Sequence, residues 1–330
     1  MKFFFCLFAT VLFGSVDQSI APRVEKVEIF ENLDAKKYSV NQLAEIDNAL
    51  KQKENRIRIV SYNMLRNDFD FRHGEEYRWS NRLPRIAELL QAMQPDIIAA
   101  QELAQDQIDD LTGYIGGKYS YFGSPREEIE WNGIFYRKER FELLGGQSWT
   151  LPVSKGKGHA LDCVKLKDLK TGRSFAVFNT HLSMHSHQPS FASGADQREY
   201  EARFILDQIQ AIYPDMPVIF AGDMNTLANR PDIELLPYHD GDYVHRILTR
   251  SLLKDAKDLS LLGHVGPLST FTNVEGSRDP FSGVGTPGIF LDHFYLTPGI
   301  TVLIHAVESG KVDGYFPSDH MPILMDFILE

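Results

Sequence analysis

Five short segments of the sequence place carboxylates, amides and imidazoles directly after apolar runs. They are Ser61-Tyr62-Asn63, Gln101-Glu102, Asn179-Thr180-His181-Leu182, Gly222-Asp223-Met224-Asn225 and Ser318-Asp319-His320, and Leu291-Asp292-His293 precedes the last of them. A hydrophobic core has no use for so many polar groups, because burying one without a partner costs free energy. Groups that do chemistry, in contrast, are often carried on loops where a rigid strand ends. The pattern predicts a site that binds Mg²⁺ and hydrolyses a phosphate ester.

Asn63 and Glu102 are the predicted ligands of the cation, since each follows a buried strand. Mg²⁺ prefers oxygen ligands and keeps several waters, so one or two carboxylates with an amide or phosphate oxygen are enough to hold it. A single glutamate in this context would more often be an exposed carboxylate at a helix cap. Its combination with Asn63 and the other segments favours a metal site, with Mn²⁺ as the alternative ion.

Asp223 and Asn225 are the residues predicted to act on the attacking water. They lie two positions apart in an extended segment, so their side chains project to the same side. The carboxylate can orient or deprotonate water while the amide donates a hydrogen bond to a phosphoryl oxygen. An isolated Asp-x-Asn is usually a turn, but here it follows the apolar run 218–222.

His320 and His181 are predicted to stabilise the transition state. An imidazolium beside the phosphate would neutralise developing charge, and a neighbouring carboxylate would keep it protonated and oriented. Asp319 is adjacent to His320, and Asp292 could partner either histidine. A lone histidine at such a position would more often be a hydrogen-bonded core group.

The elements that position these residues follow from the apolar periodicity. Strands are expected at 56–62, 97–100, 132–137, 174–179, 217–221, 291–296 and 322–327, and helices at 81–93 and 196–213. The second helix shows a capping-box pattern at Asp196 and Glu199. The polar segments recur at the ends of the strands, so we expect them to meet at one edge of the fold.

Length and composition fit a globular enzyme. The chain has 330 residues, 43% of them hydrophobic and 24% charged, so it can bury a large core. No linker or charge block divides it after residue 56, which predicts one catalytic domain over 56–330. The formal net charge of -11 provides no global basic field for nucleic acid. It does not exclude a polynucleotide substrate, because divalent cations change the local field.

The first residues are expected to lie outside the fold. Lys2 followed by an apolar run over 3–13 and small residues is typical of a secretory signal peptide, here assigned to 1–21. A buried N-terminal strand is the alternative, and the run is too short for a stable membrane anchor. Residues 22–55 then form a leader packed on the domain, and the mature chain keeps only Cys163. We expect a secreted or periplasmic protein without an internal disulfide.

The order of these segments resembles the endonuclease/exonuclease/phosphatase superfamily, whose fold is that of DNase I. The resemblance spans 56 to the C-terminus, and Gly-Asp-x-Asn and Ser-Asp-His are its most specific parts. It implies an α+β fold, a four-layer α/β/β/α sandwich of two packed mixed β-sheets flanked by helices. It also implies divalent-metal hydrolysis of a phosphoester by in-line attack of water.

The resemblance assigns roles residue by residue. Glu102 matches the family's metal ligand and Asn63 its metal-site or phosphate-site amide, while Asp319 joins the metal set as part of the final Asp319-His320 pair. The residues expected to act in catalysis are His181, Asp223, Asn225, Asp292 and His320. His293 departs from the pattern, because an aromatic residue or arginine is common there.

Substrate specificity is left open by the sequence. The segment 151–173 is rich in lysine, and Lys155 and Lys157 could form a phosphate-facing rim or belong to a solvated hairpin. Arg198 is a further candidate for substrate binding, or for an ion pair with a site carboxylate. The functions considered are a nuclease-like phosphoesterase, a phosphatase or phospholipase C-type enzyme on lipid, sugar or inositol phosphates, and a non-catalytic binding module. Accordingly, the expected partner is nucleic acid, a phospholipid or a small phosphate ester.

Overall fold

The computed structural model describes residues 51–70, 73–123, 131–152, 159–184, 194–226, 243–272 and 288–330. The predicted signal peptide and almost all of the predicted leader therefore lie outside the described residues. None of the helices in the described ranges is long and apolar enough to cross a membrane.

One sheet has the strand order β10-β12-β13-β1-β2-β4-β3. Its strands are β1 (Ile57–Asn63), β2 (Ile97–Leu103), β3 (Tyr119–Phe122), β4 (Trp131–Arg137), β10 (His264–Val265), β12 (Ile300–Val307) and β13 (Ile323–Leu329). β1 runs parallel to β2 and antiparallel to β13. The sheet is therefore mixed, with β1 near its centre.

The other sheet has the order β5-β6-β7-β8-β11-β9. Its strands are β5 (Phe141–Thr150), β6 (Ala160–Asp168), β7 (Ser174–His181), β8 (Val218–Asp223), β9 (Lys254–Asp255) and β11 (Asp292–Leu296). β7 and β8 are parallel, and β11 pairs antiparallel with β8. As a result, the end of β7, the end of β8 and the start of β11 lie at the same edge of this sheet.

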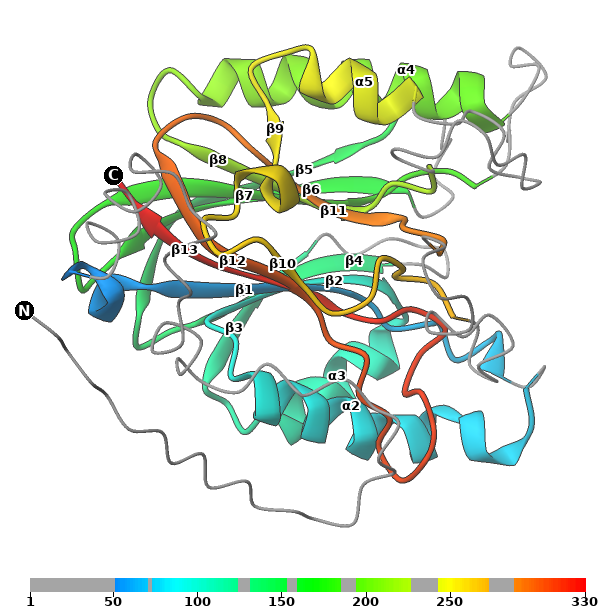
Figure 1. Cartoon of the computed structure of the whole chain (residues 1–330). Helices are drawn as coiled ribbons and strands as arrows, with labels where there is room; N and C mark the ends of the chain where they lie inside the picture. The colour runs from blue at the N-terminus through cyan, green and yellow to red at the C-terminus, as the bar shows by residue number, and fades with distance from the viewer. Residues whose placement is uncertain are drawn as a thin grey trace, which may run out of the picture.

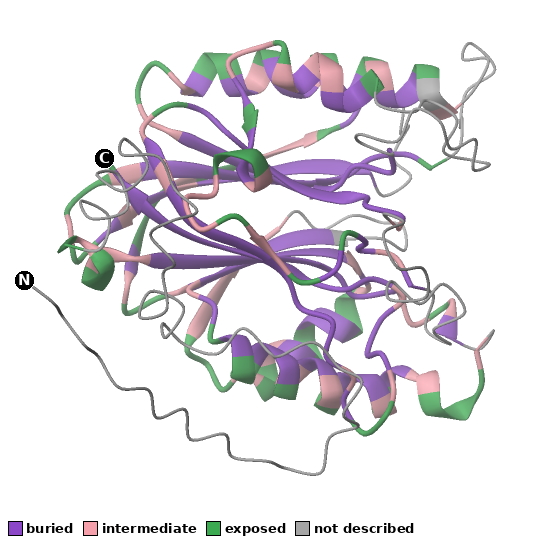
Figure 2. Ribbon diagram, viewed as in Figure 1, coloured by how far each residue is buried: buried purple, intermediate pink, exposed green. Residues whose placement is uncertain are grey.

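Helices cover the outer face of each sheet, which gives four layers (Figure 1). α2 (Trp79–Met93) and α3 (Gln105–Tyr114) lie on the first sheet, and α4 (Gly194–Ile212) and α5 (Tyr243–Thr249) lie on the second. The short elements η3 (Lys53–Asn55), η5 (Glu75–Tyr77) and α6 (Ala256–Leu259) complete the set in the described ranges. Figure 2 shows that the central strands are buried while the outward faces of the helices are exposed. The predicted α/β/β/α sandwich is confirmed.

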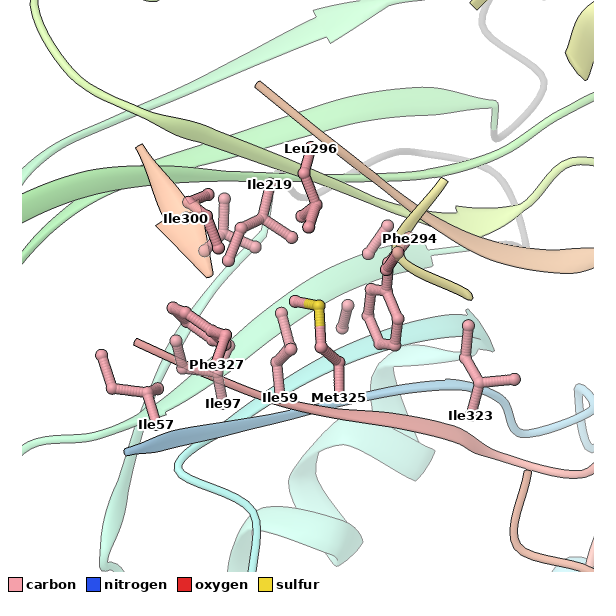
Figure 3. Close-up of a cluster of buried hydrophobic side chains, with 14 of the residues drawn as sticks. Ile57, Ile59, Ile97, Ile219, Phe294, Leu296, Ile300, Ile323, Met325 and Phe327 are labelled. Carbon is pink, nitrogen blue, oxygen red and sulfur yellow. The ribbon is translucent and has the colours of Figure 1, made fainter. Parts of the chain in front are cut away.

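The largest hydrophobic cluster fills the space between the two sheets (Figure 3). Ile57 and Ile59 of β1 meet Ile219 of β8 and Phe294 of β11 there. Two further clusters pack the outer faces of the sheets against α2 and α3 and against α4 and α5. The sheets therefore have apolar groups on both faces, which holds the strand ends in fixed positions.

Candidate active site

The inner faces of the central strands change from apolar to polar at one end of the sandwich. Along β1, Ile57 and Ile59 face the second sheet and are followed on the same face by Ser61 and Asn63, because strand side chains alternate. The same change from apolar to polar side chains occurs on the inner faces of β2, β7, β8 and β11. The polar side chains at their ends are Gln101 of β2, Asn179 and His181 of β7, Asp223 of β8 and Asp292 of β11. The predicted polar segments are thus brought together at one edge of the inter-sheet layer.

Asn63 connects two carboxylates that come from opposite sheets. Its Nδ2 donates to Glu102 Oε1 at 2.9 Å and to Asp223 Oδ2 at 3.1 Å, while its Oδ1 accepts from the backbone N–H of Leu65. The amide nitrogen therefore faces the carboxylates and the amide oxygen faces the backbone. The metal role of Asn63 stays a prediction, since its amide oxygen accepts one hydrogen bond from Leu65 and has a second lone pair.

Glu102 is presented by an irregular strand end. The pairing of β2 with β4 shifts register between Ala100 and Leu103, and Glu102 adopts a φ of 53°. A positive φ is uncommon for a residue other than glycine, and such conformations cluster at functional sites. The side chain of Glu102 keeps 16% of its surface exposed, whereas that of Asp223 keeps 1%. Glu102 is therefore the carboxylate that a cation from solvent can reach.

The segment after β8 holds Asp223 and Asn225 in place. Gly222 has a φ of 151°, and a Cβ at this position would lie 2.0 Å from the carbonyl oxygen of Thr180. Asp223 Oδ1 accepts from the backbone N–H of Asn225, whose φ is 47°. Only glycine permits this approach of β8 to β7, and the following turn directs both polar side chains into the site.

Asn225 fixes the orientation of His181. Its Nδ2 donates to the carbonyl of Leu182 at 2.8 Å and also lies 2.8 Å from His181 Nε2. Since a carbonyl can only accept, the amide nitrogen must face this side, and Nε2 of a neutral His181 accepts its second hydrogen. The proton of the ring is then on Nδ1, which lies 3.8 Å from Glu102 Oε1.

His320 lies between two buried carboxylates. Its Nδ1 is 2.8 Å from Asp292 Oδ2 and its Nε2 is 3.5 Å from Asp223 Oδ2. Burial alone would lower the pKa of His320, but Asp292 and Asp223 outweigh it and raise that pKa to about 10. Burial would likewise raise the pKa of Asp223, yet the positive charge of His320 brings it below its usual value. The ring is therefore an imidazolium at neutral pH, as the sequence suggested, and its partner is Asp292.

Asp319 lies beside the buried cluster. Its Oδ1 is 3.2 Å from Ser318 Oγ, and the same hydroxyl lies 2.7 Å from the backbone carbonyl of Asn63. In the described part of the chain, Asp223, Asp292 and His320 offer donor atoms within 4.8 Å of one another, and Asp319 is not in that group. The metal role of Asp319 stays a prediction.

The donor set suits a hard divalent cation. Glu102, Asp223 and Asp292 supply three carboxylates, and His320 supplies one positive charge. Asp223 and Asp292 are fully buried, and burial together with Asp223 raises the pKa of Asp292. Such an excess of buried negative charge is costly, and oxygen donors are the ligands that Mg²⁺ and Mn²⁺ prefer. The residues present therefore fit the metal that the sequence predicts.

A family model described as the endonuclease/exonuclease/phosphatase family matches residues 60–320. The chain belongs to this family. Protein angel of Drosophila melanogaster is 27% identical over 206 residues, which cover 56% of this chain and 56% of that protein. The chain spans about half the length of the curated relatives it matches.

Solved structures of the endonuclease/exonuclease/phosphatase family share the fold. A family member from Bacteroides vulgatus superposes with a TM-score of 0.68 at 22% identity, over 83% of this chain and 99% of that one. A mannosyl-6-phosphatase from Bacteroides thetaiotaomicron superposes with a TM-score of 0.63 at 21% identity, over 83% and 100%. At these identities the likeness shows the sandwich and not the substrate.

Several residues that support the family's site were missed or left without a role in the sequence. Gln101 Nε2 donates to Asn179 Oδ1 at 2.7 Å, which joins the two sheets beneath the catalytic groups. His159 Nδ1 lies 3.0 Å from the carbonyl of His181. Thr270 Oγ1 accepts from the backbone N–H groups of Leu291 and Asp292. Gln101 and Asn179 were visible as polar strand ends, but no local pattern marks His159 or Thr270.

The predicted substrate-binding residues are not assembled at the site in the described ranges. Arg198 is fully buried in α4 and its Nη1 donates to the carbonyls of Ser183 and Met184, so it holds the segment after β7. Lys155 and Lys157 lie outside the described residues. β6 pairs Lys167 with Ser174 at the start of β7, roughly 23 Å along the strand from His181. Lys167 therefore lies far from His181, and the rim role of Lys155 and Lys157 stays a prediction.

Proposed function

We propose that this chain is a divalent-metal-dependent phosphoesterase that hydrolyses its substrate by in-line attack of water. The observation that carries the proposal is the bridge made by Asn63. Its amide nitrogen donates to Glu102 of one sheet at 2.9 Å and to Asp223 of the other sheet at 3.1 Å. The predicted metal ligand and the predicted water-orienting group are thereby fixed next to each other. Such preorganisation is where much of an enzyme's rate enhancement originates.

Glu102, Asp223 and His181 have different roles in the proposed reaction. Glu102 would hold Mg²⁺ or Mn²⁺, which supplies neutralisation and orientation of a phosphoryl oxygen when bound. Asp223 stays ionised and can accept a hydrogen bond from the attacking water and direct it at phosphorus. His181 carries its proton on the nitrogen that faces Glu102, whereas Asn225 anchors its other nitrogen.

His320 is the positive group for the transition state. In the transition state, negative charge is spread over the oxygens of the phosphoryl group. An imidazolium within the site stabilises that charge electrostatically. Asp292 keeps the ring charged and fixes its plane through the 2.8 Å contact to Nδ1. The edge of this ring also packs on Phe271 at a centroid distance of 5.1 Å, which restricts its rotation.

Metal dependence is the first test of this function. The purified protein should lose hydrolysis of a generic aryl phosphodiester in excess chelator and recover it with Mg²⁺ or Mn²⁺. Full activity in chelator would refute the proposal. Absence of hydrolysis for every phosphoester in a broad panel, with metal binding retained, would instead favour the non-catalytic binding module.

For the substrate, the charge distribution favours a small phosphate ester over a polynucleotide. The argument for a polyanion rested on the basic segment 151–173, and the described lysines of that segment lie at the end of β6 remote from His181. The net charge of -11 also opposes a polyanion. The shared fold with a mannosyl-6-phosphatase supports a sugar phosphate as one member of this class.

A nuclease-like phosphodiesterase is the second candidate, because Lys155 and Lys157 remain candidates for contact with a polyanionic substrate. A panel of sugar phosphates, inositol phosphates, sphingomyelin, RNA and DNA, compared by kcat/KM in Mg²⁺, separates the two. A preference of about 100-fold or more for nucleic acid would overturn the small-ester assignment.

We also propose that the protein is exported to the periplasm or the medium. The support is the charged start and apolar run over 2–13, together with a mature chain whose Cys163 is buried and free. Burial raises the pKa of the Cys163 thiol to about 12, so it stays unreactive in an oxidising compartment. A mass corresponding to cleavage near residue 21 in the exported fraction would support this proposal. A full-length protein confined to the cytosol would refute it.

A further inference from the structure

A second group of metal-binding side chains lies behind the catalytic cluster, on the opposite face of the sheet. His245 of α5, Asp255 of β9 and His293 of β11 offer donor atoms that all lie within 4.8 Å of one another. His293 follows Asp292, and successive side chains of a strand project to opposite faces. Asp292 therefore contributes to the inter-sheet site while His293 points toward the helix layer. The sequence predicts no role for His245 or Asp255, and it marks His293 only as a departure from the family pattern.

We propose that His245, Asp255 and His293 form a structural zinc site that clamps α5 and β9 to β11. Asp255 Oδ2 lies 2.9 Å from His293 Nδ1 and 3.8 Å from His245 Nδ1. Tetrahedral zinc with donor distances of about 2.0–2.1 Å places its donors about 3.3 Å apart, a value between the two observed separations. Small side-chain movements would therefore bring all three donors onto one ion.

The second oxygen of Asp255 is already committed. Its Oδ1 accepts from the backbone N–H of Lys257 and caps α6, which leaves Oδ2 directed at the two imidazoles. The hydroxyl of Tyr295 lies 3.0 Å from His245 Nδ1, so an oxygen is available beside the position of a fourth ligand. All three proposed ligands are at most 8% exposed, which matches the closed character of structural zinc sites.

The charge balance also indicates a cation. The ion-pair partners of Asp255 among the described residues are the two imidazoles, with no lysine or arginine. Two imidazoles and one carboxylate form a donor set that zinc accepts readily, whereas Mg²⁺ favours oxygen ligands.

The proposed site lies where the sheet edge has few backbone contacts. β9 pairs with β11 through only the contacts of Tyr295 with Asp255 and Leu296 with Lys254. A metal that joins α5, β9 and β11 would therefore stabilise the edge of this sheet directly beside Asp292. The proposal is independent of the proposed catalytic function, since zinc would be bound there whether or not the chain hydrolyses phosphoesters.

The test measures metal binding in a background that weakens the catalytic cluster. Chelator-treated Asp223→Asn protein is titrated with Zn²⁺, and with Co²⁺ as a visible probe. We expect one equivalent of tightly bound zinc, four-coordinate Co²⁺ absorption, and a Tm rise of roughly 5 °C at a hundredfold excess over Kd. No tight zinc and no Tm rise in this protein would overturn the proposal without any ligand variant.

Ligand variants then locate the site. His245→Gln and His293→Asn, each added to Asp223→Asn, should weaken zinc binding about 100-fold and abolish the Co²⁺ absorption. His264→Asn is the matched control, because His264 is a partly buried histidine on β10 of the other sheet and lies outside the donor set. If the two ligand variants kept the parent's Kd and spectrum, or His264→Asn lost them equally, the assignment would be wrong.

Discussion

Replacing Asp292 with asparagine removes the carboxylate that keeps His320 charged while it preserves the size of the side chain. In the structure Asp292 Oδ2 lies 2.8 Å from His320 Nδ1, and the nearer of the remaining carboxylates, Asp223, lies 3.5 Å from Nε2. An asparagine can present its amide oxygen to Nδ1–H, so the ring would keep a hydrogen bond but lose the paired charge. The substitution therefore tests the electrostatic role of the pair separately from packing.

The size of the effect follows from the pKa of His320. That pKa is raised to about 10 from the ordinary histidine value of 6.5, with Asp292 ahead of Asp223 among the groups that oppose the effect of burial. The difference corresponds to about 5 kcal/mol in favour of the imidazolium. We expect the substitution to remove about half of it and lower the pKa by about 2 units. The folded pKa stays above that of a free histidine, so the loss of positive charge begins on the alkaline side.

The assay is the pH dependence of kcat on a small aryl phosphodiester in saturating Mg²⁺. At pH 6.5 the variant should lose about 100-fold in kcat from poorer orientation and weaker charge stabilisation. Above pH 8 its activity should fall about tenfold further per pH unit, at a pH where the wild-type protein still retains its imidazolium. Asp313→Asn is the control, since Asp313 is exposed and its φ of 53° suits asparagine. A variant whose profile parallels the wild type at every pH would refute the assigned role of Asp292.

Three further outcomes follow from the same structure. Glu102→Gln should raise the Mg²⁺ concentration for half-maximal activity by about 10-fold or more, as measured by metal titration, and an unchanged requirement would remove Glu102 from the ligand set. Gly222→Ala should destabilise the fold by about 2 kcal/mol or more in urea unfolding, because its Cβ would meet the carbonyl of Thr180 at 2.0 Å. His305 is fully buried, and burial lowers its pKa to about 3, so the unfolded chain takes up a proton below pH 6.5 before the folded protein does. Stability should therefore fall as the pH drops from about 6.5 towards 3, and His305→Phe should make this decline in Tm shallower.

The strand ends were predictable because two physical rules coincide in them. Alternation on a strand fixes which residues share a face, and a buried face must be apolar except where it reaches an edge. Asn63, Asp223 and His181 each follow apolar residues at the correct spacing, so their convergence could be inferred without coordinates. Helix α4 was also predictable, because a long run of apolar residues at helical spacing does not fit a strand.

Long-range pairing was not predictable from the same sequence. Arg58 alternates with Ile57 and Ile59 in the strand pattern, and nothing in the sequence marks its partner. It is buried, and its guanidinium pairs with Asp326 of β13 at 2.7 Å and 2.8 Å. Strand β5 was missed because most of its residues are exposed, so no apolar alternation marks it. The place of Lys167 was not predictable for a related reason, since composition shows charge but the register of β6 with β7 decides which end of the sheet carries it.

The orientation of Asn63 shows why residue type alone cannot assign a role within a site. Either end of an amide can face a cluster, and the sequence pattern is the same for both. The N–H of Leu65, two residues later, takes the amide oxygen and thereby turns the nitrogen toward Glu102 and Asp223. Because both carboxylates accept from one amide, the positions of the two sheets and the spacing of the charged groups are coupled. The bond from Gln101 to Asn179 directly below ties the same two sheets together. A change that slides one sheet against the other would therefore separate the predicted metal ligand from the water-orienting carboxylate before it disturbed either residue itself.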